Sequence, residues 1–432
     1  MKLHLSLPAA LMGLCLGLLG TGEAQAASFN FTKIADTNSS FSSFSNSNPN
    51  DNFFGSPALN NTGTVAFYAA LDVGGEGIFT SNGTTTTTIV DTNNSYGNPS
   101  GEPIFNSFSS LSINDAKTVA FSTRLRSSIS TTLIFKGEDE TNFELVVIAT
   151  PRDAVFFPSI NNAGTVAFLE EFTGVFVQTR IPISNGGSIS SRSCGGVFCQ
   201  PIAPGVFESI SIPMLNDAGT VAFRGSVYQS DNESDIAGGI FTGNDTPFSS
   251  EPIITTIADT SGIFRGFSDP SINNSGNVAF IAGLDTGSIG VFTGNGTTTT
   301  TIADSSGAFN SFFGTPSIND FGTVAFLAGL DVGGSGIFTG NNPLKDKVIV
   351  TGDTLFGSTV QELSFYREGL NNSGQVAFFA SLANGTSGIF RADPIVVEPP
   401  KDVPEPAGLL GLWAVGVWSA TSALKRKQKQ PS

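Results

Sequence analysis

Polar side chains that interrupt a repeated apolar phrase are the residues of this chain best suited to chemistry. The phrase ends in Val-Ala-Phe. Just past it most copies carry apolar or small residues, whereas copies two to four carry arginine or glutamate. A later irregular stretch, residues 364–368, adds a tyrosine, an arginine and a glutamate. These departures predict a polar ligand-binding site that draws on Arg124, Glu170, Glu171, Arg224, Tyr366 and Arg367.

Two of these residues, Arg124 and Glu171, occupy equivalent positions in neighbouring copies, because each lies three residues after the closing Phe. Opposite charges at equivalent positions of adjacent sheets can pair as an ion bridge. Alternatively, the two side chains line one side of a binding site. The sequence leaves both readings open.

The chain is poorly equipped for catalysis. Its only histidine, His4, falls in a leader segment described below, so the mature chain has no imidazole. This excludes Ser-His-Asp triads, Cys-His dyads and His-ligated zinc. Glu170 and Glu171 could in principle serve a glycosidase or lyase as acid and base, but adjacent residues of a strand point to opposite faces. We therefore predict a non-catalytic module that binds a glycan or a surface protein. A structural matrix scaffold and a propeller glycosidase or lyase are the alternatives.

Aspartates recur where strand-like pieces end or turn, at positions 36, 91, 259 and 304 and at positions 72, 285 and 331. Aspartate in such turns usually caps backbone amides. Calcium is the alternative, since carboxylates and backbone carbonyls are its usual ligands. No Asp-x-Asp-x-Asp-Gly loop is present, so we predict capping, with neither a metal nor a cofactor.

Two cysteines remain outside the leader, Cys194 and Cys199, in the segment Ser-Cys-Gly-Gly-Val-Phe-Cys. A local disulfide is the favoured interpretation in an exported protein. The spacing alone does not decide whether the bond forms.

The phrase that these residues interrupt is Asn-x-x-Gly-x-Val-Ala-Phe, and it occurs seven times. The second copy has Lys117 in place of the glycine. The closing phenylalanines are separated by 46 to 57 residues and stand at positions 67, 121, 168, 223, 280, 326 and 378. A period of about 50 residues built from strand-like pieces is typical of a propeller or a β-solenoid.

Each repeat reads as four strands joined by local turns, which is the blade of a β-propeller. In the fifth copy the pieces are residues 270–273, 278–282, 290–293 and 297–304. The last copy has no good fourth strand, whereas a matching piece, Thr32 to Asp36, stands near the N-terminus. We therefore predict an all-β, seven-bladed propeller over residues 27–393, closed by this N-terminal strand in the last blade, since closure removes exposed edges.

The whole chain is acidic, with a formal net charge of -16. Such a surface repels nucleic acid and anionic lipid. We expect neither as a partner.

Both ends read as targeting segments. Residues 1–26 combine Lys2, an apolar stretch and Ala24-Gln25-Ala26, as a secretory signal peptide does. Residues 394–406 form a Pro-rich linker, residues 407–424 are uncharged and just long enough to span a bilayer as a helix, and residues 425–432 are a basic tail expected to stay cytoplasmic.

The order of these C-terminal segments resembles the PEP-CTERM sorting signal of Gram-negative bacteria, with Pro404-Glu405-Pro406 as the signature tripeptide. The resemblance implies processing by signal peptidase and an exosortase, transient anchoring in the inner membrane, and release or attachment at the cell surface alongside exopolysaccharide. The repeated phrase is also similar to that of surface proteins with tandem Asn-x-x-Gly-x-x-Ala-Phe motifs. That resemblance covers residues 31–393 and implies an extracellular repeat domain.

Overall fold

The structure is a computed structural model of the chain, and it describes residues 28–44, 57–96, 98–149, 153–172, 178–182, 188–190, 207–228, 236–244 and 253–395. Every regular element within these ranges is a β-strand, so the all-β prediction is confirmed. The same ranges contain no helix that is long and apolar enough to cross a membrane. The signal peptide, the Cys194–Cys199 pair, the sorting motif, the membrane helix and the basic tail all lie outside the described residues.

The strands of the described residues form seven antiparallel sheets, which we number by the copy of the phrase that each contains. Sheet 1 holds β2 (Phe41–Ser43), β3 (Ala58–Leu59), β4 (Val65–Leu71), β5 (Glu76–Ser81) and β6 (Thr86–Asp91). Sheet 2 holds β7 (Phe105–Ile113), β8 (Val119–Leu125), β9 (Ser128–Asp139) and β10 (Asn142–Ile148). Sheet 3 holds β11 (Asp153–Ile160), β12 (Val166–Phe172), β13 (Gln178–Pro182) and β14 (Ser188–Ser190).

The other four sheets continue the pattern. Sheet 4 holds β15 (Phe207–Ile210), β16 (Met214–Leu215), β17 (Val221–Tyr228), β18 (Ile236–Asn244) and β19 (Ile253–Asp259). Sheet 5 holds β20 (Phe264–Phe267), β21 (Ser271–Ile272), β22 (Val278–Leu284), β23 (Ile289–Gly294) and β24 (Thr299–Asp304). Sheet 6 holds β25 (Phe309–Ile318), β26 (Val324–Leu330), β27 (Ser335–Phe338) and β28 (Lys347–Val350). Sheet 7 holds β29 (Thr354–Leu355), β30 (Ser358–Ser364), β31 (Val376–Leu382), β32 (Ser387–Pro394) and β1 (Phe29–Asp36).

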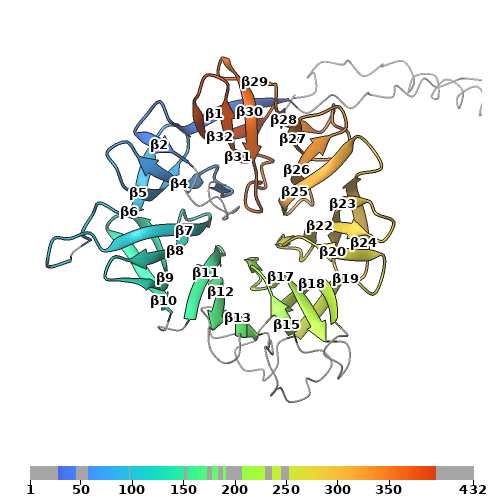
Figure 1. Cartoon of the computed structure of the whole chain (residues 1–432), viewed down its shortest axis with the longest axis horizontal. Coiled ribbons are helices and arrows are strands. Elements are labelled where there is room, and N and C mark those ends of the chain that lie inside the picture. Colours follow the sequence, from blue (N-terminus) through green and yellow to red (C-terminus); the bar gives the residue numbers. More distant parts are fainter. Residues whose placement is uncertain are drawn as a thin grey trace, which may run out of the picture. The chain divides into compact units, whose positions relative to one another are not determined.

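The sheets stand around a common centre, and each is an up-and-down meander (Figure 1). The Val-Ala-Phe strand of every copy is a long strand near the middle of its sheet, as predicted. The closing strand is also as predicted, because β1 pairs antiparallel with β32 and places Phe31 opposite Ala392. One sheet therefore contains strands from both ends of the described chain.

Phenylalanines from three successive strands form the core of a sheet. In sheet 5 the rings of Phe280 and Phe292 stack with centroids 6.0 Å apart, and Phe264 meets them edge-on at 6.0 and 5.1 Å. The same three-ring unit recurs in sheets 1, 4 and 6 as Phe41, Phe67 and Phe79, then Phe207, Phe223 and Phe241, and finally Phe309, Phe326 and Phe338. In sheet 2 the ring of Phe135 meets both Phe105 and Phe121. Such pairs contribute about 1 kcal/mol beyond area burial, which accounts for the abundance of Phe.

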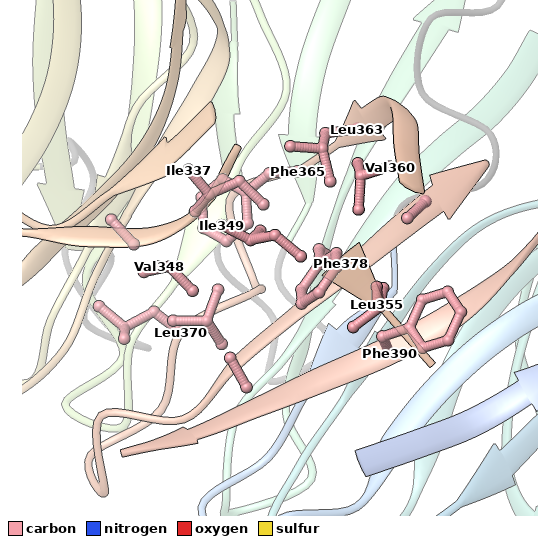
Figure 2. Packing of buried hydrophobic residues seen from close by; sticks show 14 of the residues in the cluster. Ile337, Val348, Ile349, Leu355, Val360, Leu363, Phe365, Leu370, Phe378 and Phe390 are labelled. Carbon is pink, nitrogen blue, oxygen red and sulfur yellow. The ribbon is translucent and has the colours of Figure 1, made fainter. Parts of the chain in front are cut away.

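The alanine of the phrase lets neighbouring sheets approach closely. Ala279 of sheet 5 is fully buried in a cluster with Phe326 of sheet 6, and Ala325 of sheet 6 is buried in a cluster with Phe378 of sheet 7. Figure 2 shows this second cluster, in which Ile337 of sheet 6 and Phe378 lie together. Larger side chains at the alanine position would overpack these contacts.

The asparagine and glycine of the phrase build the turn before the Val-Ala-Phe strand. In the fifth copy, the Asn273 Oδ1 atom accepts hydrogen bonds from the amides of Ser275 and Asn277 at 3.1 and 2.9 Å. Gly276 has a φ of +79°, in the left-handed region that glycine tolerates best. Lys117 adopts the same conformation, with a φ of +71°. The lysine therefore carries backbone strain that glycine would avoid.

The aspartates that end the fourth strands cap amides as predicted. Asp91 Oδ1 accepts hydrogen bonds from the amides of Asn93 and Asn94 at 2.7 and 2.9 Å, and Asp36, Asp259 and Asp304 receive equivalent bonds. The turn aspartates behave differently. In the described chain Asp72, Asp285 and Asp331 use their backbone amides, which donate to the carbonyls of Ser40, Ile263 and Ala308. Side-chain capping at these three positions is the part of the prediction that was wrong.

Candidate functional site

Seven buried or half-buried asparagine side chains connect the sheets in a closed cycle. The first Asn of each phrase donates from its Nδ2 atom to the backbone carbonyl of the equivalent Asn in the next sheet, at distances of 2.9 to 3.2 Å. The cycle runs through Asn60, Asn114, Asn161, Asn216, Asn273, Asn319 and Asn371, and it returns to Asn60. These hydrogen bonds explain why the phrase begins with Asn.

A second cycle lies one residue further along the chain, and we call it the Asn/Asp ring. Each backbone amide donates to the side-chain Oδ1 of the next member, at 2.7 to 2.9 Å, through Asn61, Asp115, Asn162, Asp217, Asn274, Asp320 and Asn372. Aspartate and asparagine alternate, so that each carboxylate has amide neighbours. For example, Asp217 Oδ2 accepts hydrogen bonds from Asn162 and Asn274 at 3.0 and 2.9 Å. An odd number of members requires one like pair, and this pair is neutral: Asn372 and Asn61.

All members of both cycles except Asn371 line a small axial cavity of about 140 Å³. Arg367 and Glu368 of sheet 7 also line it. Arg367 is only 3% exposed, and its Nη1 atom donates to the Pro213 carbonyl of sheet 4 at 2.9 Å. The Glu368 carbonyl accepts a hydrogen bond from the Leu59 amide of sheet 1 at 2.8 Å. The segment that contains Arg367 and Glu368 therefore crosses the centre of the molecule and connects sheet 7 to sheets 1 and 4.

Glu368 is a destabilised carboxylate. Its Oε1 atom is shielded from solvent and has no hydrogen-bond partner among the described residues. Burial raises the pKa of Glu368 to about 7, and the opposing effects of the Arg367 charge and of hydrogen bonds from Ser112 and Ile113 do not offset it. The described residues contain no group of three or more His, Cys, Asp or Glu side chains arranged to hold a metal. Because Arg367 and Glu368 bond to sheets 4 and 1, we interpret them as elements that fix the centre of the fold.

A larger cavity, of about 570 Å³, is formed by sheets 4 to 7, and we call it the aromatic groove. Most of its lining residues come from one position of the fold, where the first strand of sheets 5 to 7 bends before the Asn turn, while Arg224 and Leu327 lie directly after the closing Phe of their copies. The lining residues are Arg224, Phe267, Ser268, Asp269, Phe312, Phe313, Gly314, Thr315, Leu327, Ser364, Phe365 and Tyr366. This volume is typical of small-ligand sites, and its mixture of aromatic and polar groups makes it the candidate functional site.

The polar edge of the groove is an ion pair between two sheets. Arg224 Nε of sheet 4 lies 3.1 Å from Asp269 Oδ1 of sheet 5. The Arg224 side chain is 47% exposed, whereas that of Asp269 is 11% exposed. Arg224 stands directly after the closing Phe of its copy, where other copies have Tyr68, Ile281 or Leu327. A charged pair thus replaces an apolar contact between sheets and presents a guanidinium to the groove.

The apolar side of the groove is formed by phenylalanines. Phe312 and Phe365 are buried, but Phe313 is 45% exposed. Phe313 precedes Gly314, which has a φ of +67°, and the pairing of β25 with β26 is irregular from Phe313 onward. Phe313 itself pairs with Leu327, and the irregular stretch that follows it leaves the ring partly exposed in the groove.

Tyr366 completes the groove beside the centre of the molecule. Its ring lies 5.6 Å from the Arg367 guanidinium. Burial raises the pKa of the Tyr366 phenol far above its usual value, so the group is neutral at physiological pH.

The structure thus brings together two of the six predicted site residues, Arg224 and Tyr366. Arg367 is adjacent to them in the chain but lines the axial cavity. Arg124 and Glu171 are exposed on β8 and β12, and within the described residues no ion pair joins them. Glu170 is buried while Glu171 is exposed, which confirms that the two point to opposite faces. None of these three residues lines the groove.

Sequence reasoning missed several lining residues, of which Asp269 and Phe313 matter most for the site. The number of residues between the last core residue of the first strand and the Asn of the phrase could have revealed them. Sheet 5 has five residues there (268–272), sheet 6 has six (313–318) and sheet 7 has seven (364–370). Phe267, Phe312 and Leu363 are equivalent, because each pairs with the residue two after the closing Phe. The extra residues supply the bend that places Phe313 and Tyr366 along the groove.

Meander sheets arranged radially around a centre define a β-propeller, and the departures from its repeat define a groove on it. The chain belongs to a family of unknown function, DUF7453, whose model matches residues 148–410. No curated protein matches the sequence.

Several solved structures resemble the chain at low sequence identity. The β-propeller domain of the Trilobed protease from Pyrococcus furiosus is 10% identical, with a TM-score of 0.48 over 82% of this chain and 97% of that one. PorZ, a surface component of the type-IX secretion system of Porphyromonas gingivalis, is 12% identical, with a TM-score of 0.42 over 80% of this chain and 47% of that one. An ulvan lyase of polysaccharide lyase family PL25 is 8% identical, with a TM-score of 0.41 over 77% of this chain and 90% of that one.

Proposed function

We propose that the protein is an exported, non-catalytic propeller that binds carbohydrate in the aromatic groove. One observation carries the proposal: the residues that break the repeat in sheets 4 to 7 converge on a single cavity. Residues that obey the repeat are explained by folding, since they form the ring stacks, the alanine contacts and the Asn cycles. Residues that depart from the repeat have no such structural explanation. Binding residues are often found in irregular segments that a rigid scaffold positions.

The scaffold proposed for this site is a closed ring in which the seven sheets are seven blades. The cycle of asparagine hydrogen bonds supports this count, because it passes once through each sheet before Asn371 returns to Asn60. A rigid closed ring suits a binding site assembled from four sheets, because the lining residues are held without a conformational change.

The groove suits a sugar better than a protein surface. A stable protein partner would need about 800 Å² of matching surface on each side, whereas the groove is a concave cavity of about 570 Å³. Aromatic rings give a platform for the apolar face of a pyranose, and the Arg224–Asp269 pair gives donors and acceptors for its hydroxyls.

The lining residues argue for binding without turnover. Hydrolysis of a glycosidic bond usually requires two carboxyl groups. Among the residues that line the groove, Asp269 is the single carboxylate, and it is paired with Arg224. Glu368 is buried at the axial cavity and does not line the groove.

The proposed location is the cell surface. The leader over residues 1–26, and the Pro404–Pro406 tripeptide before an apolar segment and a basic tail, support export followed by sorting through an exosortase. Carbohydrate binding would suit a protein released or retained among exopolysaccharide. The membrane would be a partner only before processing.

A glycan array tests the proposal. It is incubated in turn with the purified wild type, with Arg224→Ala and with Arg124→Ala. Arg124→Ala is a matched control, because Arg124 is exposed and lies outside the groove. We expect binding by the wild type and by Arg124→Ala, and loss in Arg224→Ala, which should still unfold cooperatively although Asp269 has lost its partner. If no glycan binds, or if Arg124→Ala has the larger effect, the groove is not a carbohydrate site and a protein partner or a scaffold role takes precedence.

A further inference from the structure

The charges of the aromatic groove define the class of sugar that fits it, if the proposed carbohydrate site is correct. Among the residues that line the groove, only Arg224 and Asp269 are charged. They neutralise each other across a distance of 3.1 Å. Tyr366 adds a neutral phenol, as its raised pKa shows. The groove therefore has no net charge to offer a ligand.

An anionic sugar would meet two obstacles in this groove. Its carboxylate would have to compete with Asp269 for the Arg224 guanidinium, and displacement would leave Asp269, whose side chain is only 11% exposed, without its partner. The surrounding protein is acidic as well, with a net charge of -16 for the whole chain, and so repels anions at long range.

An uncharged sugar would meet neither obstacle. Arg224 binds Asp269 through Nε, lines the groove and has a side chain that is 47% exposed, so a ligand can reach its guanidinium. A guanidinium and a carboxylate held side by side can donate to one hydroxyl of a diol and accept from the neighbouring hydroxyl. Vicinal hydroxyls are the common feature of neutral hexoses.

Phe313 supplies the second element of recognition. It is the exposed aromatic of the groove, at 45%, between Phe312 and Gly314 on the bulge of β25. A pyranose has an apolar face of C–H groups and a polar rim of hydroxyls. The groove pairs an apolar wall with a polar edge in the same way.

We propose that the aromatic groove binds neutral hexose units of a polysaccharide, stacked on Phe313 with vicinal hydroxyls on Arg224 and Asp269, and that it discriminates against uronic acids. The discrimination depends on the ion pair rather than on shape. Removal of the Asp269 charge alone should therefore shift the preference from neutral hexoses toward uronic acids.

The test compares neutral and acidic oligosaccharides of the same backbone. The probes are tetrasaccharides of glucose, galactose and mannose and the corresponding uronates, titrated calorimetrically into the wild type, Asp269→Asn and Phe313→Ala. We expect the wild type to favour at least one neutral sugar over its uronate by about tenfold or more, which corresponds to about 1.4 kcal/mol. Asp269→Asn should narrow or reverse that ratio, because Arg224 is then unpaired. Phe313→Ala should weaken neutral sugars about tenfold or more.

The outcomes separate this inference from the proposed function. Preferential binding of a uronate by the wild type, lost in Arg224→Ala, would leave the groove as a sugar site but overturn the neutral assignment. A ratio that is unchanged in Asp269→Asn would also overturn it. Binding of no tetrasaccharide by a wild type that does bind other glycans through Arg224 would contradict the hexose assignment alone. Phe313→Trp distinguishes a stacking role from misfolding, since it should retain binding.

Discussion

The Nδ2 atom of Asn371 donates to the backbone carbonyl of Asn60 across 3.0 Å, although the two residues are 311 positions apart in the sequence. The same bond joins each pair of neighbouring sheets at much shorter sequence separation. Asn371–Asn60 therefore completes a cycle that the local turns begin. The pairing of β1 with β32 joins the same two ends of the fold at another position.

The first prediction concerns the strained turn of the second repeat. Lys117→Gly should stabilise the protein by about 1 kcal/mol, because a non-glycine residue with a φ of +71° is strained. A thermal melt measures the effect. The reciprocal change Gly276→Lys places the same residue at a φ of +79°, with no neighbouring atom within 4 Å of a Cβ, and should destabilise by a similar amount. An unchanged or lower melting temperature for Lys117→Gly would contradict the strain.

The second prediction concerns alternation in the Asn/Asp ring. Asn162→Asp replaces two donors to Asp115 and Asp217 by a third carboxylate between them. We expect a loss of about 2 kcal/mol or more in the free energy of unfolding at neutral pH. The loss should shrink at acidic pH, where the carboxyl groups are protonated and regain a donor.

Asn372→Asp is the matched control for that variant. Asn372 has one carboxylate neighbour, Asp320, and its other neighbour in the ring is Asn61. Its destabilisation in chemical denaturation should be clearly smaller than that of Asn162→Asp. Equal losses would show that alternation of charge is not what organises the ring.

The third prediction follows from the buried carboxyl of Glu368. Its pKa in the folded state is about 7, above the unfolded value of 4.5, so the folded state binds the proton more tightly. Stability is therefore greatest below the unfolded pKa, and it falls as the pH rises toward 7. Glu368→Gln removes this dependence. The variant should gain on the wild type between about pH 4.5 and pH 7, by up to ~3 kcal/mol. Denaturation curves across this window measure the gain, and parallel curves at every pH would refute the raised pKa.

The fourth prediction compares a phenylalanine of the core with a phenylalanine of the groove. Phe280→Ala removes a fully buried ring from the core of sheet 5 and should cost about 3 to 5 kcal/mol. Phe313→Ala removes a ring that is 45% exposed in the groove and should cost clearly less. Urea denaturation of both variants gives the comparison. A loss at Phe313 as large as that at Phe280 would assign Phe313 to the core rather than to a site.

Much of the fold could be predicted because the sequence of each repeat determines its local structure. The phrase fixes a turn through Asn273 and Gly276, and the incomplete last copy anticipates the pairing of β1 with β32. Hydrogen bonds between sheets were not predicted. The hydrogen bond from Asn60 to Asn114 depends on the distance between two neighbouring sheets. The sequence of a single repeat does not determine that distance.

The candidate site was predicted only in part for a related reason. Arg224 and Tyr366 were found because they differ from the repeat in residue type. Asp269 and Phe313 are ordinary residues for a loop and a strand, and they differ in position rather than type. Their role depends on the bulge at Gly314 and on contacts between sheets that are distant in sequence. Arg124 was misplaced because equivalence in the repeat does not mean proximity in space.

The most direct measurement places a reporter inside the groove. Both tryptophans of the chain, Trp413 and Trp418, lie beyond residue 395, so the fluorescence of Phe313→Trp minus that of the wild type reports on the groove. Titration with neutral hexose tetrasaccharides should shift or quench this difference signal saturably, and Arg224→Ala in the same background should abolish the response while Arg124→Ala should not. A glycan that binds the protein but leaves the reporter unchanged would show that carbohydrate is held elsewhere and would contradict the account.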